Sequence, residues 1–141
     1  MKRDGSLDLL VMLRIARAAE SEVEVKLSGI GLSLTKLMAL KVLGDAGEPM
    51  PLGQLAERLS CVKSNITQLV DRLEADGLVA RQPDPGDRRS KLAGLTAAGR
   101  RAWQDATRLQ EETERELSRR LTREEGRRLG ALLAKVGRAA K

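Results

Sequence analysis

The chain has 141 residues, with 26 Lys and Arg against 20 Asp and Glu, which gives a formal net charge of +6. It contains no His and a single Cys, so Ser-His-Asp and Cys-His catalysis, His-containing metal sites and disulfide scaffolds are all excluded. Trp103 is the only aromatic residue, and a core rich in Leu and Ala favours helix. We therefore expect one mostly α-helical domain over residues 1–141, with no catalytic residues, metal or cofactor.

Hydrophobic spacing in the first 60 residues predicts three helices. The first covers about residues 7–27, with Ser6 as its N-cap, and a Ser-Gly-Ile-Gly run ends it. The second follows Ser33 or Thr35 and ends at the glycines between positions 44 and 47. Two prolines then bracket a short extended piece, and a compact third helix is expected over residues 54–59.

A fourth helix begins near position 63 and ends at Gly77, which is a suitable C′ residue. Ile66, Leu69, Val70 and Leu73 are spaced as i, i+3, i+4 and i+7, so they predict a buried stripe. The opposite face is polar, and it consists of Lys63, Ser64, Asn65, Thr67, Gln68, Asp71 and Arg72.

Strands are expected over residues 78–81 and 91–95. The segment between them, QPDPGDRRS, is rich in turn-forming residues and too polar for a core. The sequence therefore predicts a β-hairpin with a basic tip that carries Arg88, Arg89, Ser90 and Lys91.

Thr96 is the expected N-cap of a long helix that reaches residue 119 or 120. A capping box formed by Thr122 and Glu125 opens a last helix, whose apolar residues are Leu129, Leu132, Leu133 and Val136. The first and last helices carry apolar stripes that a single chain of this size has no other obvious place to bury. We therefore expect a homodimer.

Two short helices joined by a tight turn and followed by a basic hairpin form a winged helix-turn-helix. Exposed Ser, Asn, Thr and Gln side chains can donate to and accept from base edges in a major groove. The wing cations suit phosphates or an adjacent minor groove. Arg72 has two alternatives, a phosphate contact or an ion pair with Asp71, Glu74 or Asp76. The candidate DNA-binding residues are Lys63, Ser64, Asn65, Thr67, Gln68, Arg72, Arg88, Arg89, Ser90 and Lys91.

The stretch LGQLAERLSCVKSNITQLVDRLEADGLVARQPDPGDRRSKLAGLTAAGR resembles the MarR family of bacterial transcriptional regulators. Its most specific part is the Asp87-x-Arg89 motif after Pro-Asp-Pro, with Leu-Thr-x-x-Gly ending at Gly99. The resemblance implies a DNA-binding lobe over residues 33–97 and dimerisation helices over 1–31 and 98–141. It also implies a palindromic operator in double-stranded DNA, a repressor, and release by a small anionic ligand or by thiol oxidation. Asp87 is expected to order the wing and to pair with Arg89.

Two residues have alternative interpretations. Cys61 lies in the turn of the helix-turn-helix and is either a small buried residue or a redox sensor. Trp103 fills a dimer core or lines the cleft between the dimerisation and DNA-binding parts. Val62 stands where a polar helix cap would be expected, and Ser60 is the nearest candidate for that cap.

The rival functions are a sequence-tolerant architectural DNA-binding protein and a dimeric protein-interaction module without DNA binding. An enzyme is not expected, because no phosphate-binding Gly loop or catalytic constellation is present. No apolar run suits a membrane span and no secretory signal is evident, so a cytoplasmic location is expected.

Overall fold

The structure is a computed structural model that describes residues 8–60 and 63–139. It is mostly helical, with a small antiparallel sheet in which the strand order is β1-β3-β2. The elements are α1 (Leu9–Ser28), α2 (Leu34–Ala46), β1 (Met50–Pro51), α3 (Leu52–Arg58), α4 (Lys63–Ala75), β2 (Val79–Asp84), β3 (Asp87–Leu95), α5 (Ala97–Leu117), the 3₁₀ turn η1 (Ser118–Arg120) and α6 (Arg123–Ala139).

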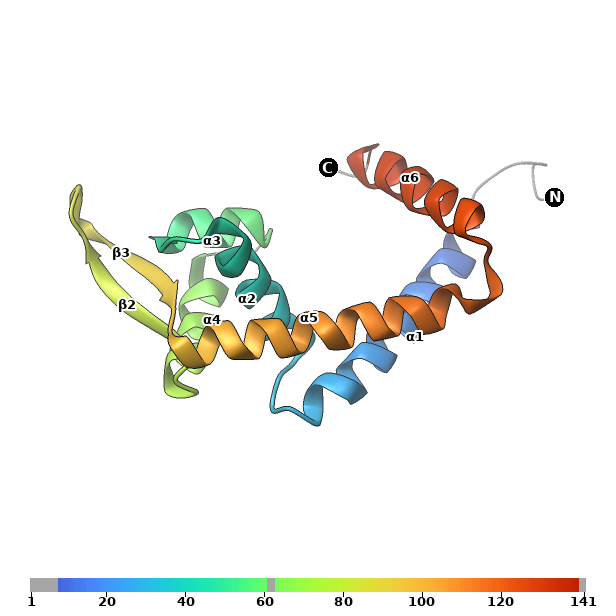
Figure 1. Ribbon diagram of the computed structural model, residues 1–141. Coiled ribbons are helices and arrows are strands. Elements are labelled where there is room, and N and C mark those ends of the chain that lie inside the picture. The colour runs from blue at the N-terminus through green and yellow to red at the C-terminus, as the bar shows by residue number, and fades with distance from the viewer. Residues whose placement is uncertain (1–7, 61–62, 140–141) are drawn as a thin grey trace.

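The long helix α5 connects two ends of the molecule (Figure 1). At one end α2, α3 and α4 pack together, and the β2–β3 hairpin projects from them as a wing. At the other end α1 crosses α5, and α6 lies beyond that crossing. The expected fold class is confirmed, since a helix-turn-helix with a β-hairpin wing is flanked by N- and C-terminal helices.

The core lies within the winged-helix end of the molecule. Its fully buried side chains include Leu40 of α2, Leu55 of α3 and Val79 of β2. The four apolar residues of α4 are also buried, which confirms the stripe predicted from their spacing. Burying that stripe fixes which face of α4 remains in water, because the helix has only one apolar side.

Helix caps explain most of the boundaries. The Thr96 hydroxyl accepts from the Gly99 amide at 2.9 Å, as predicted, and the Ser33 hydroxyl accepts from the Lys36 amide at 3.2 Å, which selects Ser33 over Thr35 as the cap of α2. The expected capping box also forms, with reciprocal bonds between Thr122 and Glu125. The prediction of Ser6 as the first cap is wrong. Asp8 caps α1 instead, because its carboxylate accepts from the amides of residues 10 and 11.

The two hairpin strands are longer than predicted. They pair from Val79 with Leu95 out to Asp84 with Asp87, so most of the polar segment expected to be a loop belongs to the ladder. Strand pairing uses backbone groups, and a two-stranded ribbon in water needs no apolar side chains at its tip. The third helix also begins earlier than expected, directly after Pro51.

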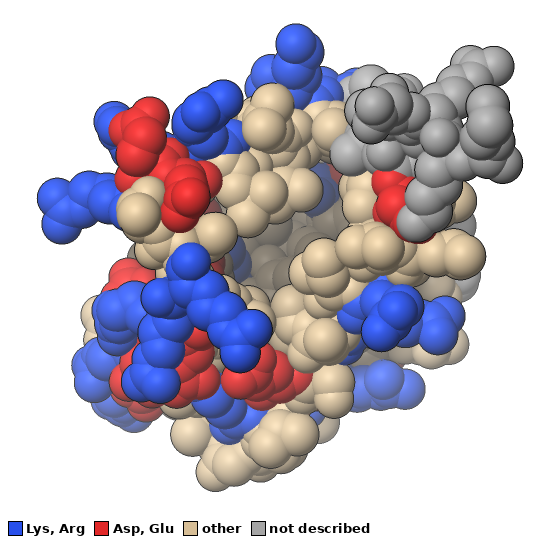
Figure 2. Space-filling view, turned by 90° about the vertical axis from the view of Figure 1, so that its right-hand side faces the viewer, with Lys and Arg blue, Asp and Glu red and all other residues tan. Residues whose placement is uncertain are grey.

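The end of the molecule distant from the wing exposes large apolar side chains. On α1 they include Leu10 and Ile15, and on α6 they include Leu129, Leu132 and Leu133. Figure 2 views this end and shows uncharged residues around a hollow, with charged groups beside them. Among the described helices, none is long and apolar enough to span a membrane.

Candidate nucleic-acid interface

Helix α4 presents a polar face to solvent. Asn65, Thr67, Gln68 and Arg72 are exposed, while the opposite side of the helix is buried. These are the positions that the sequence assigned to base and phosphate contacts. Amide and hydroxyl groups on one face of a slim helix can reach base edges in a major groove.

Four residues around the start of α4 are described only in part or not at all. Lys63 and Ser64 lie in the first turn of α4, but their side chains are outside the described part of the structure. Cys61 and Val62 lie outside the described residues altogether. The alternative roles of Cys61, and the cap of α4, therefore stay predictions.

The tip of the wing carries the basic residues on β3. Arg88, Arg89 and Lys91 are exposed, and Ser90 is half-buried. The Asp87 carboxylate accepts a hydrogen bond from the backbone amide of Arg89 at 2.9 Å. The contact expected between these residues therefore involves the Arg89 backbone, and no ion pair between their side chains occurs in the described chain. The Arg89 guanidinium is left facing solvent.

The base of the wing is fastened to α5 through Thr96. Its hydroxyl donates to the Gly77 carbonyl at 2.6 Å, and its backbone amide donates to the Leu78 carbonyl at 3.1 Å. Gly99 lies directly against that Leu78 carbonyl, and a Cβ at position 99 would be only 1.9 Å from the oxygen. The long helix, the end of α4 and the wing therefore meet at one closely packed junction.

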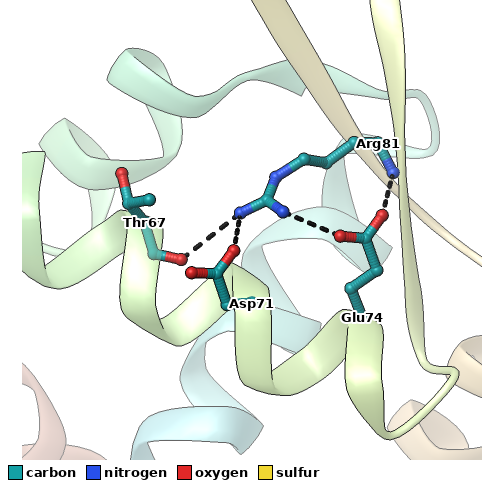
Figure 3. Close-up of polar contacts among 4 residues, drawn as sticks. All are labelled: Thr67, Asp71, Glu74 and Arg81. Carbon is teal, nitrogen blue, oxygen red and sulfur yellow. Dashed lines mark hydrogen bonds and ion pairs between the residues drawn. The ribbon is translucent and has the colours of Figure 1, made fainter.

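Arg81 of β2 connects the wing to α4 (Figure 3). Its guanidinium donates to Glu74 at 2.7 Å, to the Asp71 carboxylate, and to the Thr67 carbonyl at 3.4 Å. Its backbone amide also donates to Glu74, at 3.3 Å. The hydrogen bond to Asp71 is the main reason that the pKa of Arg81 is raised above its ordinary value.

Arg81 was not among the functional residues predicted from the sequence. The available signal was the i, i+3 spacing of Asp71 and Glu74 followed by a cation just after the turn at Gly77. Such a pattern does not specify a partner, because the carboxylates have several cations nearby in sequence. Only the antiparallel return of β2 beside α4 selects Arg81.

Arg72 does not form the ion pair that the sequence left as an alternative. Asp71 and Glu74 bind Arg81, and Asp76 binds Lys36 of α2 at 2.7 Å. Within the residues described, Arg72 makes no ion pair. Its contact with phosphate stays a prediction.

Trp103 of α5 packs within its own chain. Its ring lies against Gly44 of α2, and the side chain is half-buried beside the hydrophobic core. A shallow pocket beside it is lined in part by Pro49, Leu95 and Arg100. The indole packs between α2 of the DNA-binding lobe and α5 of the same protomer, and it lines this pocket, which agrees with the alternative that placed Trp103 between the DNA-binding and dimerisation parts.

No group of three or more His, Cys, Asp or Glu residues in the described chain could hold a metal ion. A polar recognition helix beside a basic wing, both fixed to one helical junction, defines a DNA-binding protein of the winged helix-turn-helix class.

The comparisons with known proteins give the family. The MarR family model matches residues 32–91. YcgE of Bacillus subtilis, described as an uncharacterized HTH-type transcriptional regulator, is 37% identical over 111 residues, which are 79% of this chain and 70% of that protein. The chain belongs to the MarR family, whose members are DNA-binding transcriptional regulators and not enzymes.

Other relatives differ in the direction of regulation. The transcriptional repressor Rv2887 of Mycobacterium tuberculosis is 28% identical over 127 residues, covering 90% of this chain and 91% of that protein. The transcriptional activatory protein BadR of Rhodopseudomonas palustris is 43% identical over 68 residues, covering 45% of this chain and only 39% of BadR.

A solved relative contains DNA. The chain is similar to a mutant of MarR from E. coli complexed with operator DNA, with a TM-score of 0.81 and 25% identity over 89% of this chain and 90% of that one.

Proposed function

We propose that this regulator is a homodimeric repressor that binds a palindromic operator in double-stranded DNA. The observation that carries the proposal is the joint exposure of the polar face of α4 and the basic tip of the wing. These two surfaces belong to one lobe, so they can engage a major groove and the adjacent backbone together. The relatives named as regulators, and the operator complex of MarR from E. coli, support the same assignment.

The proposed contacts divide into two classes. Ser64, Asn65, Thr67 and Gln68 read base edges, because their groups both donate and accept hydrogen bonds. The remaining candidates contact the DNA backbone, because cations and hydroxyls at these positions suit phosphates or a minor groove. They are Lys63, Arg72, Arg88, Arg89, Ser90 and Lys91.

Homodimerisation is supported by the apolar surface distant from the wing. Leu132 is 58% exposed and Leu133 53% exposed in the single chain, although both lie on the apolar side of an amphipathic helix. A second copy would bury these residues and α1 together, and a two-fold axis would set two α4 helices about 34–36 Å apart, one turn of DNA.

The dimer is tested by Leu132→Asp. Light scattering on a sizing column should give twice the chain mass for the wild type and the chain mass for the variant, with helical content retained by circular dichroism. A wild-type monomer at micromolar concentration would overturn the dimer.

DNA binding is tested by fluorescence anisotropy with the duplex upstream of the protein's own reading frame and with a scrambled duplex, each at two salt concentrations. A preference of about 10³ or more at physiological salt is expected of an operator-specific regulator. Equal binding to both duplexes would favour the architectural alternative. A dimer that binds neither duplex would favour the protein-interaction module.

The direction of regulation has a separate test, because relatives include both a repressor and an activatory protein. A reporter driven by the bound upstream DNA should rise when the regulator is deleted. A fall in the reporter would make the protein an activator.

We also propose that a small ligand or an oxidant releases the protein from DNA. The proposed location is the cytoplasm, where the DNA lies. Cys61 is the only thiol in the chain, so Cys61→Ser separates the two routes. Loss of DNA binding in peroxide by the wild type alone would assign an oxidant, whereas insensitivity of both proteins to peroxide would leave a small ligand.

A further inference from the structure

The contacts of Arg81 join two surfaces that the proposed function uses together. Asp71 and Glu74 lie on α4, and Arg81 lies on the wing strand β2. The guanidinium donates to both carboxylates and to the Thr67 carbonyl, and the Arg81 backbone amide adds a bond to Glu74. Four hydrogen bonds therefore cross from one wing residue to the helix.

The side chain of Arg81 is only 24% exposed, whereas the arginines at the tip of the wing, Arg88 and Arg89, are exposed. Its planar guanidinium can bind two carboxylates at once, which an ammonium group holds less rigidly. This cation is therefore used inside the protein, whereas Arg88 and Arg89 make no ion pair among the described residues.

The same contact also neutralises charge on α4. Asp71 and Glu74 are carboxylates on the helix proposed to enter the DNA groove, where phosphates would repel them. Without Arg81, two carboxylates would remain unpaired next to the polar face of the helix.

We infer that Arg81 is a positioning residue that locks the wing to helix α4, so that the wing and the helix meet DNA in one fixed geometry. The inference rests on the proposed operator binding. It assigns to Arg81 the discrimination between operator and other DNA, and it assigns no contact between Arg81 and DNA.

The double variant Asp71→Ala/Glu74→Ala distinguishes a general charge effect from a positioning role of Arg81. Removing two negative charges near DNA should tighten binding to every duplex if charge alone matters. If Arg81 positions the wing, the ratio of operator affinity to scrambled-duplex affinity should fall about tenfold. The ratio is the informative quantity, because a general charge effect acts on both duplexes and cancels.

Two substitutions of Arg81 complete the test. Arg81→Met should lower the same ratio, and Arg81→Lys should restore it only in part, because lysine keeps the charge without the planar fork. Arg108→Met is the matched control, since Arg108 lies on α5 and its ion pair with Asp105 stays within that helix. It should lose affinity for both duplexes equally or not at all.

The operator duplex is one recovered by selection with the full-length protein from a random-sequence pool. An unchanged ratio in both the double variant and Arg81→Met, with melting temperatures near that of the wild type, would overturn the inference.

Hydrogen exchange in the free protein gives a readout that does not need DNA. The β2 amides should exchange faster in the double variant, while amides in α2 and α5 keep their protection. If the wild type binds all duplexes alike, the proposed function and the discrimination assigned to Arg81 have both failed, and the exchange result then tests only whether Arg81 locks the wing to α4. Unchanged protection of β2 would then reject it.

Discussion

Gly44 of α2 lies so close to Trp103 of α5 that the indole occupies the space of a side chain at position 44. A Cβ there would be 2.4 Å from Cδ2 of the ring. This contact fixes how closely α2, which supports the DNA-binding lobe, approaches the helix that reaches the distant end of the molecule.

Gly44→Ala should therefore destabilise the protein by about 1–3 kcal/mol, because the ring and α2 must separate. In an open helix the same change would be stabilising, by up to about 1 kcal/mol. Thermal unfolding followed by the fluorescence of the single Trp measures the effect. Gly53→Ala is the control, since nothing lies within 4 Å of its Cβ position. A Gly44→Ala protein as stable as the wild type would contradict the contact.

Thr96→Val should cost about 1–2 kcal/mol of unfolding free energy, because it removes the N-cap of α5 and leaves the Gly77 carbonyl without its donor. Thr96→Ser keeps both bonds and should lose much less. The matched control is Thr107→Val, whose hydroxyl donates only to the carbonyl of Trp103 in its own helix. Urea titration of the three variants checks the order, and equal losses for Thr96→Val and Thr107→Val would refute a special role for the junction.

Arg89→Ala and Gln68→Ala should weaken DNA binding in different ways. Loss of the wing cation should reduce affinity for operator and scrambled duplexes alike, and should lower the salt slope by about one. Loss of the Gln68 amide should instead relax base preference by about 1–3 kcal/mol at one position of the operator. Anisotropy titrations over a series of salt concentrations separate the two. Equal losses on both duplexes for Gln68→Ala would remove it from the base-reading set.

Acid should weaken the contact between α1 and α5. Lys26 donates to Glu116 at 2.7 Å, and this hydrogen bond lowers the pKa of the Glu116 carboxyl below its ordinary value. A depressed folded pKa contributes stability above the unfolded pKa and loses it as the pH falls through the folded value. The contribution should therefore begin to fall near pH 4.5, the ordinary pKa, and should be lost only at still lower pH, where the carboxyl of the folded protein is protonated. Glu116→Gln should be less stable than the wild type at pH 7, and the difference should vanish in acid. Melting temperatures measured from pH 7 to pH 3 check this, and a constant difference would exclude the linkage.

Local sequence patterns were sufficient to predict the order of elements and several boundaries. The caps at Ser33 and Thr96 and the capping box at Thr122 are local hydrogen-bonding patterns, so neighbouring residues specify them. The α4 stripe is likewise a matter of spacing along one helix. The length of the wing was not predicted, because residues such as Gln82 and Pro83 lack the apolar alternation by which strands are recognised.

Local features of the chain are enough to give the class of this protein. The polar face of α4 and the cations at the wing tip are both visible as patterns within short segments. The side-chain contacts between elements, in contrast, follow only from the packing of the folded chain. In the folded chain, Asp71 and Glu74 bind Arg81, and Asp76 binds Lys36. The ring of Trp103 packs against Gly44. Each of these contacts joins different elements of the fold, and spacing along the chain does not specify which of several similar side chains becomes the neighbour. That choice depends on how the helices and strands pack around the buried core.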